Sequence, residues 1–253
     1  MHAPAASIIP SDLLLTAYRS GIFPMADSRE DPEIFWIEPK KRAILPLERF
    51  HCSHSLAKVL RSGRFAVTCN AAFAEVIAAC AAPRPGHPDS WISERIAASY
   101  RALHALGQAH SLECWLDGQL VGGLYGVGFD RVFCGESMFS RATDASKVAL
   151  AWLVVALKHA GVTLLDCQFI TGHLASLGAV EISQKQYLDL LRQAQDQRGA
   201  SWFSLPEGFS AVLAAAGAAG GFAGAGAAAA AGAVTGEASS PGKFIAQSLT
   251  HTS

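Results

Sequence analysis

The sequence predicts an α+β fold in which a mixed sheet is flanked by helices and preceded by a small N-terminal domain. The first observation is a series of three short strands, 111–116, 120–128 and 132–139, with alternating or apolar patterns. The second is a helical segment, 144–159, that is followed by a further strand, 163–169. Antiparallel strands, a helix and another strand together indicate a mixed sheet with helices packed on it.

The composition fits this fold and excludes several classes of protein. Of the 253 residues, 51% are hydrophobic and 16% are charged, which excludes a disordered chain. The 20 basic and 21 acidic residues give a net charge of −1, which excludes attachment to nucleic acid or membrane by bulk charge. The six cysteines form no CxxC pair and lie in apolar segments, which indicates reduced thiols in a cytoplasmic protein. The first ten residues lack a cationic start and an apolar run, so no signal peptide is expected.

Residues 1–38 are expected to form the small N-terminal domain. Apolar side chains recur at helical spacing over 11–20, with Ser11 as the predicted N-cap and Gly21 as the stop. The residues before Pro24 are expected to be extended, because a residue that precedes proline avoids the helical region. An acidic, irregular stretch then leads to the proposed boundary.

The second domain, 39–209, contains further helix and turn signals. Ser90 or Ser93 is predicted to cap a helix that ends at Gly107. Asp117-Gly118 is typical of a two-residue hairpin turn. The remaining predicted elements are helices at 73–80, around Leu174 and at 183–194, and a turn near Phe129-Asp130.

The segment 210–253 differs in composition from the rest of the chain. Ala and Gly make up 20 of the 25 residues from Ala211 to Thr235, and none of these 25 is charged. A flexible low-complexity linker is favoured over a transmembrane span, because Ala is nearly neutral towards lipid and Gly loses backbone entropy on ordering. A short polar tail, 239–253, is expected to follow.

A basic segment from 40 to 64 carries a local charge of +6. It contains one acid, Glu48, and two interpretations remain open: a solvated helix face, or a surface that binds phosphates. The seven cations are Lys40, Lys41, Arg42, Arg49, Lys58, Arg61 and Arg64.

Acidic and amide side chains interrupt two predicted strands. Two-residue alternation places Glu136 on one face with Met138, and it places Asp166 beside Gln168. An unpaired buried carboxylate costs several kcal/mol, so each position is either a strand end that reaches solvent or part of a functional site. Because two strands of one predicted sheet carry such residues, a functional site and solvent-exposed strand ends are equally favoured.

Other candidate sites are weaker. His51, Cys52 and His54 have metal-like spacing, but no second pair completes a ligand set, so no metal is expected. Cys134 and Cys167 lie in apolar contexts typical of unreactive thiols. The turn at 140–143 before the long helix has no glycine, and Ser137 lacks the closing glycine of a nucleophile elbow.

These residues resemble the leucyl/phenylalanyl-tRNA–protein transferase family. The resemblance extends in family order from about residue 11 to 209, and it is specific as a combination rather than in any one string. The matching strings are LLTAYRSGIFP (14–24), SWI (90–92), HSLE (110–113), LVGGLYGV (120–127), FCGESMFS (133–140), ASK (145–147), LDCQ (165–168) and ASLGA (175–179).

The resemblance implies an enzyme that transfers Leu or Phe, and Met less often, from aminoacyl-tRNA to proteins with N-terminal Lys or Arg. The product then becomes a signal for degradation in the bacterial cytosol. The second domain would be a GNAT-like acyltransferase domain that uses no coenzyme A or other cofactor. Neither a membrane nor DNA is an expected partner.

The family's functional positions fall on eight residues of this sequence. Asp166, acting through Gln168, would orient the α-amine and help to remove its proton, while Glu136 would hold the amine and the acceptor's cationic side chain. The donor side chain would occupy a slot formed by Met138 and Leu124. The other three positions are Tyr18, Trp91 and Tyr100 for the terminal adenosine, with core packing as the alternative for the latter two. If tRNA is the donor, the basic segment offers His54, Lys58, Arg61 and Arg64 to its phosphates.

The sequence also departs from the family pattern. Met25 replaces a common Trp, Ile37-Glu38 replaces a frequent Ser-Pro pair, and an N-terminal Gly-Gly-Asp-Leu string is absent. Two other functions stay open: a coenzyme A-dependent N-acetyltransferase, disfavoured by the glycine-free turn, and a non-catalytic tRNA-binding module, which leaves Glu136 and Asp166 unexplained.

Overall fold

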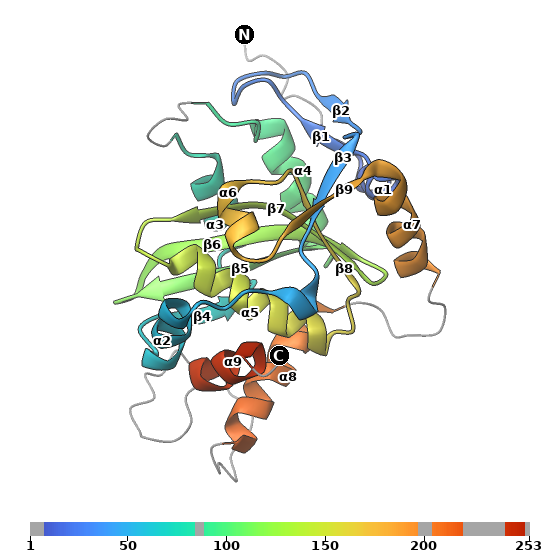
Figure 1. The fold of residues 1–253 in the computed structure, drawn as a ribbon. Coiled ribbons are helices and arrows are strands. Elements are labelled where there is room, and N and C mark those ends of the chain that lie inside the picture. Colours follow the sequence, from blue (N-terminus) through green and yellow to red (C-terminus); the bar gives the residue numbers. More distant parts are fainter. Residues whose placement is uncertain (1–7, 84–88, 197–203, 220–240, 251–253) are drawn as a thin grey trace.

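A computed structural model describes residues 8–83, 89–196, 204–219 and 241–250 of the chain. Its centre is a seven-stranded sheet with the order β4-β5-β6-β7-β8-β3-β9 (Figure 1). Only β7 and β8 pair in parallel, and every other neighbouring pair is antiparallel. The predicted α+β class with a mixed sheet is therefore confirmed. The strands are β3 (Lys41–Ile44), β4 (Ala66–Cys69), β5 (Ala109–Leu116), β6 (Gln119–Phe129), β7 (Val132–Ser140), β8 (Leu164–Gln168) and β9 (Val180–Ser183).

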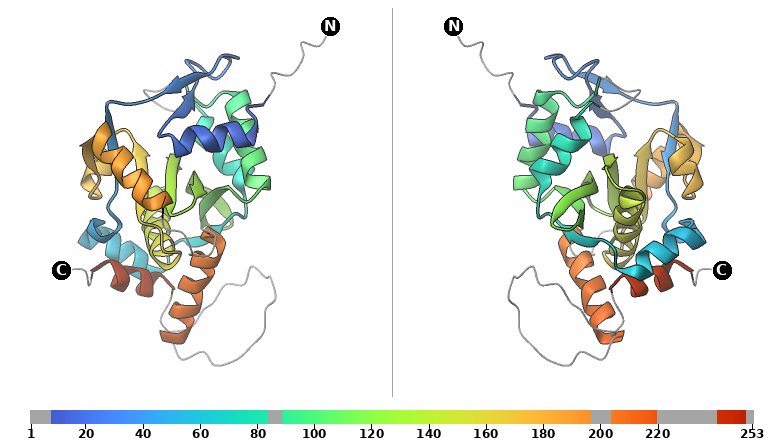
Figure 2. Two further views of the ribbon diagram at one scale, coloured as in Figure 1. Left: turned by 90° about the vertical axis from the view of Figure 1, so that its right-hand side faces the viewer. Right: turned by 90° about the vertical axis from the view of Figure 1, so that its left-hand side faces the viewer.

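Helices cover both faces of this sheet (Figures 1 and 2). One apolar cluster joins the sheet to α2 (His54–Ser62), α5 (Ala145–His159), α8 (Leu205–Ala219) and α9 (Pro241–Thr250). A second cluster joins the opposite face to α1 (Ser11–Arg19), α3 (Phe73–Ala81), α4 (Glu94–Ala105) and α7 (Gln184–Gln195). Other elements are a two-stranded ribbon of β1 (Phe23–Met25) and β2 (Phe35–Ile37), a 3-10 turn at Leu47–Arg49, and the short helix α6 (Gly172–Ser176).

Local signals in the sequence account for most of these boundaries. Ser93 caps α4 by accepting a hydrogen bond from the backbone N–H of Ile96. Asp117 and Gly118 have φ angles of 51° and 74°, as a two-residue hairpin turn requires. The N-cap of α1 is Pro10 and not Ser11, and no side chain caps this helix.

Three short strands of the main sheet were not predicted, namely β3, β4 and β9. Each has only four residues, which is too few for alternation to be distinguished from an irregular segment. Their hydrogen-bonding partners also lie far away in sequence, because β3 pairs with β8 and β9, and β4 pairs with β5.

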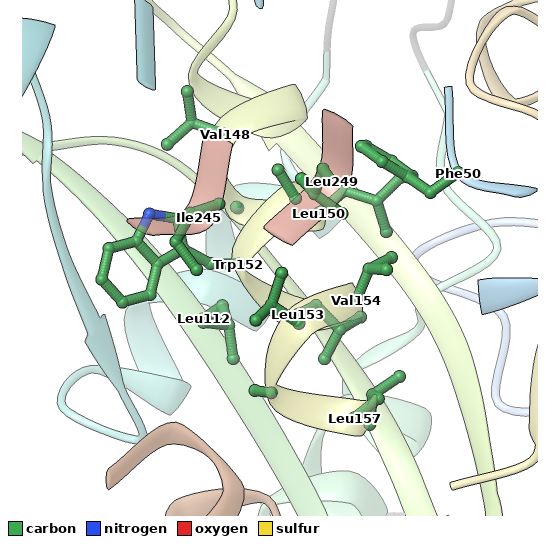
Figure 3. Close-up of a cluster of buried hydrophobic side chains, with 14 of the residues drawn as sticks. Phe50, Leu112, Val148, Leu150, Trp152, Leu153, Val154, Leu157, Ile245 and Leu249 are labelled. Carbon is green, nitrogen blue, oxygen red and sulfur yellow. The ribbon is translucent and has the colours of Figure 1, made fainter. Parts of the chain in front are cut away.

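The expected linker and polar tail differ from the observed C-terminal region. The position 210 falls inside α8, and α9 lies within the segment expected to be a polar tail. Gly242 packs so closely on α2 that a Cβ there would lie 2.0 Å from the carbonyl oxygen of Leu60. Ile245 and Leu249 are buried in the cluster formed on α5 (Figure 3). Residues 220–240 of the expected linker lie outside the described residues.

Within the described ranges, no helix combines the length and the apolar character that crossing a bilayer requires. The membrane alternative for 211–235 falls largely on residues outside those ranges.

Candidate active site

A cavity of about 700 Å³ lies where β7 and β8 separate. The two strands pair in parallel as far as Cys134 and Asp166 and no further. Glu136 and Gln168 follow these last paired residues, and both line the cavity. Apolar side chains from three strands and helix α5 form much of the remaining wall, among them Leu124, Met138, Leu150, Leu153 and Leu165.

A β-bulge in β7 positions the Glu136 carboxylate. Tyr125 of β6 pairs with Ser137, and the next residue, Gly126, pairs with Gly135. Glu136 therefore has no partner in the ladder. A bulge of this kind leaves one residue unpaired and redirects its side chain.

The bulge interrupts the two-residue alternation along β7, so the prediction that Glu136 and Met138 share a face is wrong. Met138 packs against the cluster on the α5 side of the sheet, beside its cross-strand partner Leu124. Cys134 belongs to the cluster on the opposite side, and Glu136 reaches Tyr100 in that same layer. Met138 and Glu136 thus do not share a face, and the apolar slot lies on the other side of the strand from the carboxylate's anchor.

Both carboxylate oxygens of Glu136 accept hydrogen bonds. The side-chain amide of Gln168 donates to Oε1 over 3.1 Å, and the hydroxyl of Tyr100 donates to Oε2 over 3.0 Å. The hydroxyl of Tyr100 lies 2.5 Å from that of Tyr18. The two tyrosines form a polar chain behind the carboxylate, which fixes its position at the cavity wall.

This arrangement changes the interpretation of Tyr18 and Tyr100. Both rings are buried and neither lines the cavity, so no base can stack on them in this conformation. Trp91 is the member of the predicted adenosine-binding trio that does line the cavity. Tyr100 is therefore packed in the core, as the alternative interpretation expected, and Tyr18 is packed there as well.

Burial raises the pKa of Glu136 to about 7. Hydrogen bonds from Tyr18 and Tyr100 lower the pKa, and the nearby carboxylate of Asp166 raises it. A carboxyl group with a pKa close to neutrality can accept or donate a proton at physiological pH.

Asp166 lies behind the cavity, in a buried ion pair with Arg42. Nε of Arg42 donates to Oδ1 over 2.9 Å and Nη2 donates to Oδ2 over 2.6 Å, while Tyr187 donates to Oδ2 over 3.1 Å. The side chains of Arg42 and Asp166 are 1% and 0% exposed. The guanidinium also lies over the rings of Phe23 and Tyr187. Bidentate geometry and buried partners make this a rigid anchor.

The anchor determines the backbone conformation of Gln168. Oδ1 of Asp166 accepts the backbone N–H of Gln168 over 2.9 Å, which is the hydrogen bond of an Asx turn. Gln168 has a φ of 54°, in the left-handed region that a non-glycine residue adopts only when its surroundings hold it there. The turn directs the amide of Gln168 toward Glu136.

The geometry places Asp166 behind Gln168, the residue through which it was expected to act. Its oxygens are occupied by Arg42, Tyr187 and the backbone of Gln168, and it does not line the cavity. Asp166 thus contacts groups that hold Gln168 in place, whereas Glu136 and Gln168 line the cavity. Sequence reasoning missed Arg42, which was counted among the surface cations, and Tyr187. The available signal was the apolar run 43–45 directly after Arg42.

The expected phosphate-binding cations lie on α2 and just after it. His54, Lys58 and Arg61 recur at i, i+4 and i+7, so they share one face of the helix, and all three are exposed. Arg64 follows the helix and is exposed as well. Because Arg42 is buried, it does not belong to this basic surface.

The start of α5 is occupied by groups of the protein itself. The backbone N–H of Ser146 donates to Oγ of Ser140, and the N–H of Ala145 donates to the carbonyl of Ala142. Gly122 of β6 allows this close approach, because a Cβ there would lie 2.5 Å from the Cβ of Ala145. Asp144, which precedes the helix, is paired with Lys147 over 2.9 Å. These features are unfavourable for the pyrophosphate of coenzyme A.

Comparison with known proteins identifies the family. The sequence model of the leucyl/phenylalanyl-tRNA protein transferase matches residues 44–192, and that of the N-terminal domain of the same transferase matches residues 9–40. The chain belongs to the leucyl/phenylalanyl-tRNA–protein transferase family. It is therefore an aminoacyltransferase, as the sequence predicts.

Relatives in this transferase family align over most of the chain. The leucyl/phenylalanyl-tRNA–protein transferase of Novosphingobium aromaticivorans is 63% identical, with 97% of each chain covered. That of Zymomonas mobilis is 56% identical over 79% of this chain and 76% of its own. That of Rhizorhabdus wittichii is 60% identical over 72% of this chain and 74% of its own.

Proposed function

We propose that this chain transfers Leu or Phe, and Met less readily, from aminoacyl-tRNA to the α-amine of proteins that begin with Lys or Arg. The modified N-terminus marks the protein for degradation in the cytoplasm. The observation that carries the proposal is the placement of Glu136 and Gln168 beside an apolar slot in one cavity. All six cysteines are free thiols, in keeping with a reducing compartment.

The slot suits the side chain of the donor amino acid. Leu124 and Met138 lie opposite each other on β6 and β7, and Leu150 and Leu165 complete an apolar surface. A flexible Met adapts to Leu, Phe and Met side chains more readily than a β-branched residue would. Burial also raises the pKa of Cys167 at this wall, so its thiol remains protonated and does not compete as a nucleophile.

The donor is an activated ester, so the reaction needs a neutral amine held close to the carbonyl carbon. Ionised Glu136 accepts one proton from the α-ammonium group. The nitrogen lone pair then bonds to the carbonyl carbon, and the bond from that carbon to the ribose oxygen breaks. A second proton passes from the nitrogen to the ribose oxygen, and Glu136 releases its proton to water. Gln168 holds the Glu136 carboxylate in the orientation that this step needs.

The charge of Glu136 also supports a cationic acceptor. It is the only acidic side chain among the described residues that line the cavity, and the one Arg in that lining, Arg141, is exposed to solvent. An ionised carboxylate in a partly enclosed site attracts the α-ammonium group and the adjacent Lys or Arg side chain, and it repels an acidic N-terminal residue.

Assays of transfer and of ligand binding together separate the three candidate functions. We expect label to pass from Leu-tRNA to a peptide beginning with Arg, and neither to an N-acetylated copy nor to a peptide beginning with Asp. Coenzyme A is expected to show no binding in a calorimetric titration. Acetyl transfer from acetyl-coenzyme A would instead favour the acetyltransferase, and tRNA binding without any transfer would favour the binding module.

Replacing Lys58, Arg61 and Arg64 with Ala is expected to raise the KM for aminoacyl-tRNA and to reduce its salt dependence. Each phosphate contact contributes about 0.7–0.9 to the slope of log affinity against log salt, so the slope should fall by about 2–3. The KM for the acceptor peptide should not change. The matched control replaces Lys185 and Arg192, two exposed cations of α7, with Ala. An unchanged slope in the triple variant would show that these three residues form an ordinary solvated surface and do not contact phosphates.

A further inference from the structure

Two exposed aromatic residues of the β1–β2 ribbon are not explained by the proposal above. Phe35 is 44% exposed and Trp36 is 42% exposed. Large apolar side chains that remain exposed beside a cavity often mark the place where a ligand binds. The strand register decides which of the two belongs to the cavity.

The register places Phe35 on the cavity face of the ribbon. Phe35 pairs with Met25, and Ile37 pairs with Phe23. Paired residues of antiparallel strands lie on the same face, and both Phe23 and Met25 line the cavity. Trp36 pairs with Pro24, so it lies on the opposite face.

The ribbon is joined to the other aromatic residue of this wall. The backbone N–H of Ala26 donates to the carbonyl oxygen of Trp91 over 3.2 Å, directly after Met25. Trp91 lines the cavity and is partly exposed. Trp91 and Met25 thus both line the cavity, and Phe35, which is not part of its lining, is the cross-strand neighbour of Met25.

We propose that Phe35 is a positioning residue for the donor, and that its ring stacks with the terminal nucleobase of the aminoacyl-tRNA together with Trp91. This inference rests on the proposed function. It assigns the aromatic contact at this wall to Phe35, because Met25 offers no π-face. Stacking suits a nucleobase because every base presents a planar π-face, whereas the acceptor's cationic group is drawn to Glu136.

The test measures binding and turnover separately. The binding probe is 3′-amino-3′-deoxyadenosine that carries phenylalanine in amide linkage, titrated calorimetrically so that no transfer takes place. Phe35→Ala should weaken its binding about tenfold and raise the KM for aminoacyl-tRNA similarly, with kcat and the KM for the acceptor peptide unchanged. Phe35→Trp should bind at least as well as the parent chain.

Trp36→Ala is the matched control, because Trp36 is equally exposed on the other face, and its binding should stay within twofold. Phe35→Leu keeps apolar bulk in case the Ala variant does not fold, and it should still weaken binding several-fold. Equal affinity of Phe35→Leu and the parent chain, or an equal loss in Trp36→Ala, would overturn the inference. Failure of the parent chain to bind the probe would also overturn the inference. If the parent chain binds the probe but transfers no amino acid to any peptide, the proposed function is overturned instead.

Discussion

Replacing Arg42 with Met is expected to lower the free energy of unfolding by about 3–5 kcal/mol at pH 7. The substitution leaves the Asp166 carboxylate buried without its cation, because both of its oxygens are bonded by the guanidinium. It also removes the hydrogen bond from Arg42 to the carbonyl oxygen of Gly21. The loss can be measured by urea denaturation with linear extrapolation.

The double variant Arg42→Met with Asp166→Leu is the control for this prediction. It removes both charges, so it should recover a large part of the lost stability, as apolar replacements of buried ion pairs often do. Its transfer activity should stay low, because no carboxylate then holds the backbone N–H of Gln168. A loss below about 1 kcal/mol in the single variant would contradict the assignment of this pair as the anchor of the site.

Replacing Glu136 with Gln is expected to lower kcat about 100-fold at pH 7, with saturating aminoacyl-tRNA. The parent chain should lose activity as the pH falls through about 7, because protonated Glu136 cannot accept the proton of the α-ammonium group. In the variant the amine must arrive already neutral, so the midpoint of the acid limb should move up to the ordinary α-amine value, about 7.7–8.0. The measurement is a pH profile of kcat from 5.5 to 9.

The ratio of the parent kcat to the Glu136→Gln kcat distinguishes a proton-accepting role of Glu136 from a positioning role. It should shrink above pH 8, where the amine is neutral without help. A ratio that is constant with pH would show that Glu136 positions the substrates but takes no proton.

Loss of folding cannot account for the expected result of Glu136→Gln. The pKa of Glu136 is raised from 4.5 to about 7 in the folded chain, so the protonated form stabilises the fold and the ionised form opposes it. That opposition grows as the pH rises from 4.5 through 7. The variant, which has no charge here, should therefore be at least as stable as the parent chain at pH 8.

The sequence predicts the parts of this fold that carry strong local signals. The hairpin at Asp117-Gly118 is specified by its turn, and α5 by fifteen residues of apolar helical pattern. The strands β3, β4 and β9 have no such signal, because four residues acquire their conformation from partners that lie far along the chain. Helix α9 was missed for a related reason: its composition is weakly apolar, and packing against α2 makes it part of the core.

The candidate site shows the same division. The buried acids Glu136 and Asp166 are visible in the sequence because they interrupt apolar strands. Their different roles are not visible, because the roles depend on the bulge in β7 and on Arg42. A one-residue irregularity in strand pairing reverses every later side chain, and no periodicity in the sequence records it.

The packing of α9 also affects the order in which the core forms during synthesis. The apolar faces of α2 and α5 that receive Ile245 and Leu249 are synthesised before α9, which covers them. A chain that terminates after α8 would lack Ile245 and Leu249, which are part of the apolar cluster built on α5 (Figure 3). A truncation that removes α9 would therefore yield a product with exposed apolar surface, prone to aggregation and proteolysis.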